Sequence, residues 1–536
     1  MSEKYSLHTF MFPFRWDYVS SDKPKENDSY SKRTKLSDFD RVFTTCETLK
    51  RNEFKIELDN ENFNEYTYFH EYARKALYDI GNVNNTPDKN EVLYYDKDGI
   101  PGDILSIEIK DGKQYDLFPD NICLHIYSTG IGILSYNLSN YKYNNEEDIL
   151  NINEFGRRIY PQFLAMNDVK MTKDSFLANK ISGNIGHIAF EEDFNQYKNS
   201  IELESTFLPP DHIKKIFGYK GQENESTNQA FVFRKSHERK GNIRISKLTD
   251  DRMFFLSYFK SAEKVNKLAK PISGNNEKIE YEYLTDGFWY AYVFGDKNKN
   301  DITVKNVNFQ KEEIRRLTYD RWLDQKNIDI KNHIKDNDQK DGVLYGMSRD
   351  SFVCVGSWFL LPIHMTTMYY QMAILCLAQR ASVLRFSYEV SLITDQLEEN
   401  KDATRDIKDL YKNYIQFINK IYFREVTPQL QGIEMYNQFQ DVMGLEKDVK
   451  DLDNEIRELH TYISMVEQSN LSKVAVWFLP AGVLVGILGM NTFAEGTFRF
   501  ETNDIDWLSI GWIVAVILFS GLFTLAMIQY FNRKTR

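Results

Sequence analysis

The tripeptide Gly489-Met490-Asn491 combines residue types that suit recognition of a hydrated metal ion. Glycine lets the backbone approach closely and turn. The carboxamide oxygen of Asn491 accepts hydrogen bonds from the water around Mg²⁺, an ion that dehydrates reluctantly. A ring of such oxygens, one from each subunit, can bind the hydrated ion without trapping it by charge. The alternative is that Asn491 only caps the C-terminus of a helix, a common role for asparagine.

Two short stretches in the first half of the chain have the composition of a nucleotide site. One holds two adjacent arginines followed by a tyrosine, and guanidinium groups bind phosphate through two hydrogen bonds while an aromatic ring stacks on a base. The other is an acidic pair and an arginine at the start of an apolar run, where a carboxylate can accept from a ribose hydroxyl or an amino group. The candidate ligand-binding residues are Arg157, Arg158, Tyr160, Asp250, Asp251 and Arg252. Internal pairing of arginine with aspartate at strand ends is the alternative interpretation.

The Gly-Met-Asn tripeptide closes a charge-free apolar run, and a second such run follows it. The first covers residues 474–494 and the second residues 507–532. Each exceeds the roughly 20 residues that a helix needs to cross a bilayer. The connector between them, residues 495–506, has only 12 residues. We therefore predict a two-helix transmembrane hairpin in the lipid bilayer, with both chain termini on one side.

The charges around the hairpin predict which side that is. Lys473 precedes the first run, and three basic residues follow the second, whereas the connector holds four acidic residues and one arginine. Because cytoplasmic flanks are rich in Lys and Arg, both termini are expected in the cytoplasm. The opening residues lack a basic segment followed by an apolar one, so no signal peptide is predicted.

Composition narrows the function of the large segment before the hairpin. The net charge of the 536-residue chain is −11 and its pI is about 5.5, so direct nucleic-acid binding is not expected. Aromatic residues reach 14%, which favours a well-packed globular body. We find no nucleophile–base pair, no paired metal-ligand motif and no phosphate-binding loop, and therefore predict that the protein is not an enzyme.

Residues 1–345 are predicted to form an α+β domain that senses a ligand. Aromatic and β-branched runs predict strands within residues 121–138, 228–235, 252–260 and 287–295, and helical patterns occur at 64–80 and 312–326. Residues 352–379 carry no charge. We interpret them as a buried strand and a core helix that starts near His364. A third membrane span is the alternative, which the polar residues of the run disfavour.

Residues 346–472 are predicted to be helical and to end in a long stalk helix, with residues 473–536 as the transmembrane domain. Pro428 marks the start of the last long helix, which would measure roughly 80 Å from Met435 to Met490. Apolar residues recur in it at heptad spacing, at Leu445, Val449, Leu452, Ile456, Leu459, Ile463 and Val466. We favour a symmetric stalk of several copies, and a packing contact within one chain is the alternative.

The C-terminal hundred or so residues resemble the CorA superfamily of magnesium channels. The shared features are a cytoplasmic body, a long stalk helix, a first span that ends in Gly489-Met490-Asn491, a short outer loop, a second span and a basic tail. Pro480 also stands nine residues before Gly489, as in the family. The resemblance implies a homopentamer in the bacterial inner membrane, Mg²⁺ as the transported or regulatory ion, and Asn491 facing that hydrated ion.

The oversized body, together with the arginine pair and the acidic pair described above, resembles that of the CorA-type membrane effectors encoded beside type III CRISPR systems. This resemblance implies an antiviral function. The body would bind a nucleotide second messenger that joins adenosine phosphate to S-adenosylmethionine (SAM-AMP), and the membrane part would then perturb the host envelope. The alternatives are a divalent-cation transporter gated by intracellular Mg²⁺ and a structural membrane anchor without conduction.

Overall fold

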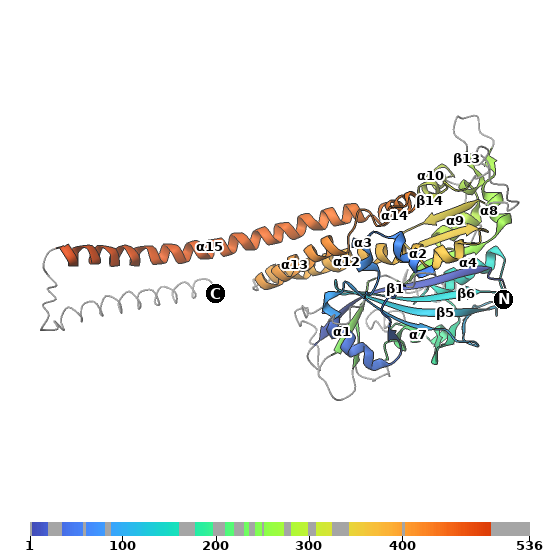
Figure 1. The fold of residues 1–536 in the computed structure, drawn as a ribbon, viewed down its shortest axis with the longest axis horizontal. Helices are drawn as coiled ribbons and strands as arrows, with labels where there is room; N and C mark the ends of the chain where they lie inside the picture. Colours follow the sequence, from blue (N-terminus) through green and yellow to red (C-terminus); the bar gives the residue numbers. More distant parts are fainter. Residues whose placement is uncertain are drawn as a thin grey trace. The chain divides into compact units, whose positions relative to one another are not determined.

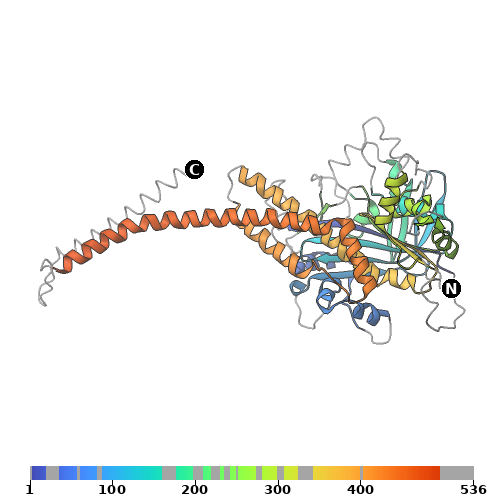
Figure 2. The same ribbon diagram turned by 90° about the horizontal axis from the view of Figure 1, so that it is seen from above.

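The computed structural model describes residues 3–19, 35–56, 61–80, 87–159, 177–196, 209–218, 230–234, 242–248, 251–272, 280–297, 307–323, 342–398 and 403–494. The chain divides into two compact units. The first comprises Met1–Lys401 and Asp409–Asp453, and the second comprises Asp402–Lys408 and Asn454–Arg536. Figures 1 and 2 show the ribbon in two views.

A large, mostly antiparallel sheet is the frame of the first unit. Its central path runs in the order β14-β15-β16-β11-β1-β6-β5-β4-β7-β8, and β2, β3, β9 and β10 join from the side. The pair β11–β16 is parallel. The strands of this sheet are β1 (Ser6–Val19), β2 (Lys50–Arg51), β3 (Val92–Asp98), β4 (Ile104–Glu108), β5 (Gln114–Tyr127), β6 (Ile131–Asn140), β7 (Lys180–Ile185), β8 (Ile188–Asp193), β9 (Ala230–Arg234), β10 (Asn242–Lys247), β11 (Phe254–Lys260), β14 (Thr318–Tyr319), β15 (Val343–Met347) and β16 (Ser351–Gly356).

Strand β1 organises the core because it pairs along both of its edges. It pairs with β6 on one edge, and on the other with β11 over its first half and β10 over its second half. Side chains alternate between the two faces of a strand. Every second residue of β1 therefore enters the main hydrophobic core, namely Phe10, Phe12, Phe14, Trp16 and Tyr18.

Helices cover both faces of the sheet. The long helix α12 (Met368–Glu398) packs against β1 and β6, and α4 (Glu146–Gly156) packs against β1, β4 and β11. The other helices are α1 (Leu36–Phe43), α2 (Glu61–Tyr68), α3 (Glu71–Leu77), α7 (Asp211–Lys214), α8 (Ala262–Leu268), α9 (Gly287–Phe294), α10 (Val307–Leu317), α11 (Leu361–Thr366), α13 (Thr404–Lys420), α14 (Leu430–Met443) and α15 (Leu445–Ala494). A small two-stranded sheet pairs β12 (Pro271–Ile272) with β13 (Glu280–Tyr281).

Most of the predicted strands are confirmed, with one error. The helical pattern at 64–80 corresponds to the two helices α2 and α3, and the pattern at 312–326 is helical only to Leu317, where α10 ends and β14 follows. The strands expected in 121–138, 228–235 and 252–260 are β5 and β6, β9, and β11. Residues 287–295, also predicted as a strand, instead form helix α9. The Asp286 side chain caps its start by accepting from the Trp289 amide, and Gly295 ends it in the left-handed conformation. These end signals outweigh the strand preference of the aromatic residues.

The charge-free run 352–379 is a strand followed by helices, as predicted. Its first residues lie in the buried strand β16, and α11 and the start of α12 follow. The helical region, however, does not begin at residue 346. Strand β16 pairs with β11 and β15, so the sheet of the α+β domain extends to Gly356.

The last long helix starts later than predicted. Helix α14 ends at Met443, Gly444 adopts a left-handed conformation with φ of 72°, and α15 then runs without a break from Leu445 to Ala494. Gly444 therefore forms a corner within the segment that was predicted to be one helix from Met435 onward. Glycine has no Cβ, so it takes this backbone conformation at little cost.

Most residues of the heptad seam of α15 are buried within the single chain, whereas Leu459 and Val466 are partly exposed. The exposed fractions of Leu445, Leu452, Ile456 and Ile463 are 3% or less. Burial of these residues fits the packing contact within one chain that the sequence left open, and the oligomer stays a prediction. Within the described residues, no helix combines the length and apolarity required of a membrane span. The connector 495–506 and the second run, 507–532, lie outside the described residues.

Candidate functional site

The predicted ligand residues of the body meet at the end of α4. This helix starts at the cap residue Asn145, whose side chain accepts from the Asp148 amide, and ends with Arg157 as its C-terminal cap. The next residue, Arg158, forms an antiparallel bridge with Arg252. The bridge includes a bond from the Met253 amide to the Arg157 carbonyl, at 2.8 Å. Two segments almost a hundred residues apart are thereby joined just before β11.

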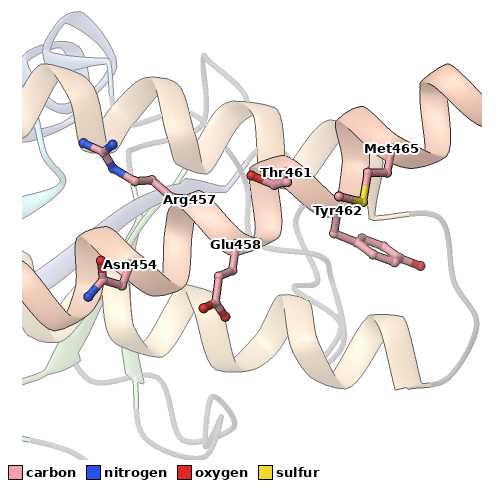
Figure 3. A pocket seen from close by; sticks show the side chains of 6 residues that line it. All are labelled: Asn454, Arg457, Glu458, Thr461, Tyr462 and Met465. Atoms are coloured by element: carbon pink, nitrogen blue, oxygen red, sulfur yellow. The ribbon is translucent and has the colours of Figure 1, made fainter.

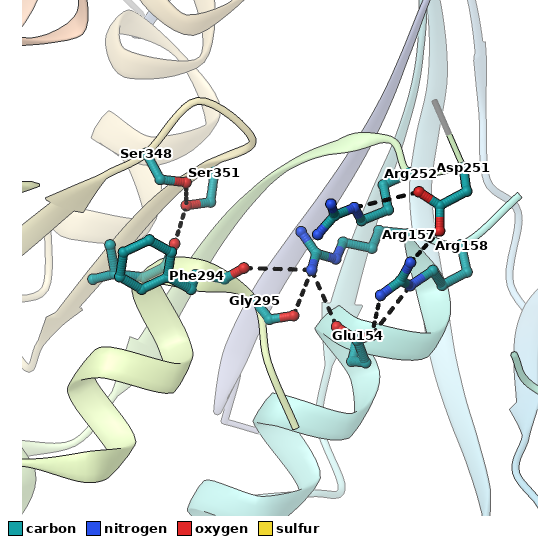
Figure 4. A network of polar contacts seen from close by, with 10 residues as sticks. Glu154, Arg157, Arg158, Asp251, Arg252, Phe294, Gly295, Ser348 and Ser351 are labelled. Carbon is teal, nitrogen blue, oxygen red and sulfur yellow. Dashed lines mark hydrogen bonds and ion pairs between the residues drawn. The ribbon is translucent and has the colours of Figure 1, made fainter. Parts of the chain in front are cut away.

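Two carboxylates and three arginines form a buried ion-pair network here (Figure 4). Glu154 accepts from Arg157 Nη2 at 3.1 Å and from Arg158 Nη2 at 2.7 Å, each with a different oxygen. Arg158 Nη1 also pairs with Asp251 Oδ2. Arg252 Nε lies 3.5 Å from Asp251 Oδ1. Glu154 is therefore the centre of the network, because it holds both adjacent arginines.

The network is almost entirely removed from water. Glu154, Arg157, Arg158 and Asp251 are between 0% and 3% exposed, whereas the Arg252 side chain is 33% exposed. Burial alone raises the pKa of Glu154, but Arg157 and Arg158 overcome that effect and hold it below its ordinary value. Burial lowers the pKa of Arg158, and the paired carboxylates more than reverse this. These charges are stable because each is paired.

Arg157 differs from Arg158 in having hydrogen-bonding capacity left over. Its Nη2 also donates to the Gly295 carbonyl at 2.6 Å, and its guanidinium lies over the Phe255 ring, 5.2 Å from the centroid. Its Nε and Nη1 have no hydrogen-bond partner among the described residues. Burial lowers the pKa of Arg157, and Glu154 only partly compensates.

Gly295 packs directly against Arg157 and Phe255, where a larger residue would not fit. A Cβ atom at this position would lie 2.7 Å from Arg157 Cζ and 2.6 Å from an atom of the Phe255 ring. Its φ of 65° is also in the left-handed region. The close packing of the α9 end against Arg157 therefore requires glycine at position 295.

The structure brings four of the six predicted ligand residues together: Arg157, Arg158, Asp251 and Arg252. Tyr160 and Asp250 lie outside the described residues. The sequence reasoning missed Glu154, although its position three and four residues before the arginines is the spacing at which charged side chains pair along a helix. It also missed Gly295, which is distant in sequence, and gave no role to Phe255, which lies in the apolar run after Arg252.

The Gly-Met-Asn tripeptide lies within α15, which continues past Asn491 to Ala494. Gly489 was expected to let the chain turn at the end of the helix, but the backbone remains helical through this residue. Asn491 is likewise not the residue that ends the helix. The tripeptide is thus an extension of the same helix that begins beside the body at Leu445.

An open pocket of about 480 Å³ follows one face of α15 in the second unit. Its lining comes from successive turns of the helix, as Figure 3 shows, and comprises Asn454, Arg457, Glu458, Thr461, Tyr462 and Met465. Tyr462 is 51% exposed and Met465 63%. This face is separate from the buried heptad seam and was not singled out from the sequence.

The described residues contain no group of three or more His, Cys, Asp or Glu side chains arranged to hold a metal ion. Comparison of the chain with protein-family models, with characterised proteins and with solved structures finds no match. The function is therefore inferred from the sequence and the geometry described above.

Proposed function

We propose that the protein is a CorA-like membrane effector. Its cytoplasmic body binds a nucleotide second messenger of the SAM-AMP type in type III CRISPR antiviral defence, and its C-terminal hairpin then perturbs the membrane. The observation that carries the proposal is the continuity of α15. One helix of 50 residues, about 75 Å long, starts at the body and includes the Gly-Met-Asn tripeptide. A rearrangement in the body can therefore be transmitted toward the tripeptide along one continuous helix.

In this proposal, the Gly-Met-Asn tripeptide of α15 binds hydrated Mg²⁺ as the ion passes through the membrane. In a homopentamer, five Asn491 carboxamides would form a neutral ring of oxygen acceptors around the ion's water shell. Mg²⁺ retains its waters, so a ring that bonds to water rather than to the metal suits rapid passage. Gly489 and Met490 would shape the same opening.

The arginine network supports an anionic ligand in the body. The two nitrogens of Arg157 that have no hydrogen-bond partner among the described residues favour a phosphate oxygen. Arg158, which Glu154 and Asp251 already occupy, would instead hold the network in shape. Arg252 is the most exposed of the three arginines and would contact the ligand first. Tyr160, Asp250 and Asp251 complete the proposed set of nucleotide-binding residues.

The test combines flux and binding on the full chain. Purified protein in liposomes should carry Mg²⁺ when the SAM-AMP conjugate is added, and Asn491→Ala should abolish flux while binding the conjugate normally. Arg157→Ala/Arg158→Ala should weaken equilibrium binding at least about a hundredfold, since each charged contact to phosphate contributes about 1.5–3 kcal/mol. Because this double variant also breaks buried ion pairs, Arg252→Ala serves as a milder probe, and thermal melting confirms that each variant is folded.

Three outcomes would separate the alternatives. Flux that responds to intracellular Mg²⁺ and ignores the conjugate would indicate an ordinary divalent-cation transporter. Parental flux in Asn491→Ala would show that the tripeptide does not contact the ion. Protein that inserts and assembles but conducts nothing under either condition would indicate a structural anchor.

A further inference from the structure

Helix α4 carries a second buried polar side chain one turn before Arg157. Asn153 and Arg157 are four residues apart, so they lie on the same face of the helix. This helix packs against β1 and β11, where His8 lies opposite Ser257 and Phe255 lies two residues before Ser257. The Asn153 side chain contacts His8, and the Arg157 guanidinium lies over the Phe255 ring. The two side chains therefore follow one another along the same two strands.

His8 is the centre of a chain of buried hydrogen bonds that ends on Asn153. Asn140 Nδ2 donates to Ser6 Oγ at 2.7 Å, and Ser6 Oγ lies 2.8 Å from His8 Nε2. On the other side of the ring, His8 Nδ1 lies 2.7 Å from Asn153 Oδ1, and Ser257 Oγ is farther from Nδ1, at 3.4 Å. Ser6, His8, Asn140 and Asn153 are all 0% exposed.

These contacts determine which nitrogen of His8 carries the proton. Burial lowers the pKa of His8 from 6.5 to about 4, so the ring is neutral near neutral pH, and one of its nitrogens donates while the other accepts. The carboxamide oxygen of Asn153 can only accept. His8 Nδ1 is therefore the donor, and Nε2 accepts from the Ser6 hydroxyl.

This arrangement leaves the amide nitrogen of Asn153 available. Asn153 Nδ2 has no hydrogen-bond partner among the described residues, and the same holds for Nε and Nη1 of Arg157 on the next turn of α4. Asn153 is 0% exposed and Arg157 1%. A buried donor without an acceptor is costly. Three such donors on one face of a helix therefore favour a ligand with several acceptor oxygens, as a phosphate group has.

We propose that Asn153 is a further phosphate-binding residue of the arginine network and that His8 positions it. The His8 proton holds Asn153 Oδ1, so that Nδ2 donates to a phosphate oxygen together with the Arg157 donors. His8 does not contact the ligand and acts through Asn153. The inference rests on the proposed function in taking the arginine network as the ligand site, and it concerns only the phosphate of the nucleotide.

The position of the His8 proton is the first test. Nitrogen NMR of the detergent-purified full chain, with isotope-labelled histidine, should show Nδ1 protonated and Nε2 unprotonated near neutral pH. The His8→Asn variant identifies the signals of His8 by their loss. A proton on Nε2 would overturn the proposal, because Nδ1 would then accept from the Asn153 amide and Nδ2 would already be occupied.

Equilibrium dialysis of the full chain with labelled inorganic phosphate is the second test, because this probe supplies the acceptor oxygens without a nucleoside. Asn153→Ala should weaken phosphate binding at least about tenfold, the effect of one lost hydrogen bond to a charged group. Asn151→Ala is the matched control. Asn151 lies on the same helix and is 8% exposed, but its Nδ2 already donates to Tyr115 Oη at 3.0 Å. This variant should bind phosphate as the wild type does.

Two variants of His8 test its positioning role. His8→Leu removes the ring donor and should weaken phosphate binding, whereas His8→Asn should restore it, because its amide can donate to Asn153 in place of Nδ1. Rescue by this polar side chain would not follow from a role in packing alone.

Equal phosphate binding by Asn153→Ala and the wild type, or no phosphate binding by the wild type, would overturn the proposal. If Asn153→Ala fails to fold, the His8 proton still decides the matter. Neither measurement uses the SAM-AMP conjugate or ion flux, so failure here and failure of the proposed function are distinguishable.

Discussion

At the scale of single residues, Glu154 stabilises the body by holding two buried arginines with one carboxylate. Removing one partner of a buried pair leaves an uncompensated charge, which costs about 3–5 kcal/mol. Glu154→Gln should therefore lower the free energy of unfolding of the body by about this amount in urea titrations. As a control, Glu191→Gln removes an ion pair with Lys180 in which Glu191 is 64% exposed, and should cost less than about 1 kcal/mol. Equal, small effects would show that Arg157 and Arg158 find other partners.

His125 predicts a particular dependence of stability on pH. It is fully buried between Tyr94 and Tyr370, and its ring nitrogens have no hydrogen-bond partner among the described residues. Burial lowers the pKa of His125 from 6.5 to about 3. The unfolded chain therefore takes up a proton below pH 6.5 that the folded chain excludes. The stability contributed by the neutral ring is complete above pH 6.5 and is lost as the pH falls toward 3.

Replacing this side chain should flatten that response. As the pH falls from 6.5 to 4.5, the free energy of unfolding of His125→Phe should decrease less steeply than that of the wild type. The difference between the two slopes should be up to about 1.4 kcal/mol per pH unit. Urea titrations at several pH values measure the slope. Burial lowers the pKa of His8 and His212 in the same direction, so a residual slope should remain. An identical slope in the variant and the wild type would mean that His125 is protonated in the folded protein.

The site could be predicted in part because its chemistry is local in sequence. Adjacent arginines and an acidic pair before an apolar run are visible as unusual charges, and the structure places Arg158 against Asp251. The sequence could not show that these charges pair with one another, since this depends on the bridge between Arg158, just after α4, and Arg252, just before β11. Nor could it show that Arg157 has spare donors, because this depends on Gly295 and Phe255, which arrive from elsewhere in the fold.

At the scale of elements, the end signals of α9 outweighed the residue preferences on which its prediction as a strand was based. Residues 287–294 are aromatic and β-branched, yet they form α9 because Asp286 caps the start and Gly295 permits the exit. The heptad of α15 predicted a packing seam, preferably between several copies, and most of its residues are buried in the single chain. Its partner could not be predicted, because a regular apolar stripe fits a neighbouring helix of the same chain as well as another copy.

Gly444 gives an element-scale prediction at the corner that starts α15. Its φ of 72° costs an L-residue about 1–2 kcal/mol, although a Cβ atom there would meet nothing closer than 3.7 Å. Gly444→Ala should therefore destabilise the protein by about that amount through backbone strain alone. Gly444→Asn should cost less, since asparagine tolerates the left-handed region. Thermal melting of the two variants distinguishes them, and equal melting temperatures would show that the corner can relax.

At the scale of the whole molecule, the sequence predicted an α+β body followed by a long helix, and the structure describes both. The order of strands in the sheet could not be predicted, because β1 pairs with partners up to about 250 residues away, such as β11. The sheet also extends beyond the predicted domain boundary at residue 345, because β16 pairs with β11, a strand about a hundred residues earlier. The strand β16 was predicted as a buried strand, but its sequence does not show that it joins the sheet of the body through β11.

The oligomer remains a prediction, and the structure suggests a different face for it. Buried Leu452 is unavailable, so Leu452→Asp should destabilise the chain itself. Tyr462 and Met465 are exposed in the pocket on α15, and Arg457 and Glu458 beside them offer opposite charges to a neighbouring copy. Aromatic side chains, Met and Arg are typical of interface cores.

Tyr462→Glu/Met465→Glu should therefore dissociate the homo-oligomer, because a ring of subunits would bring two acidic residues from each copy together at the contact. Native mass spectrometry of the detergent-purified full chain measures the number of subunits. Leu430→Glu is the matched control, since Leu430 is an apolar side chain on α14 that is 57% exposed, and it should leave the assembly intact. An unchanged subunit number in the double variant would rule out this face of α15 and require the copies to meet through another surface.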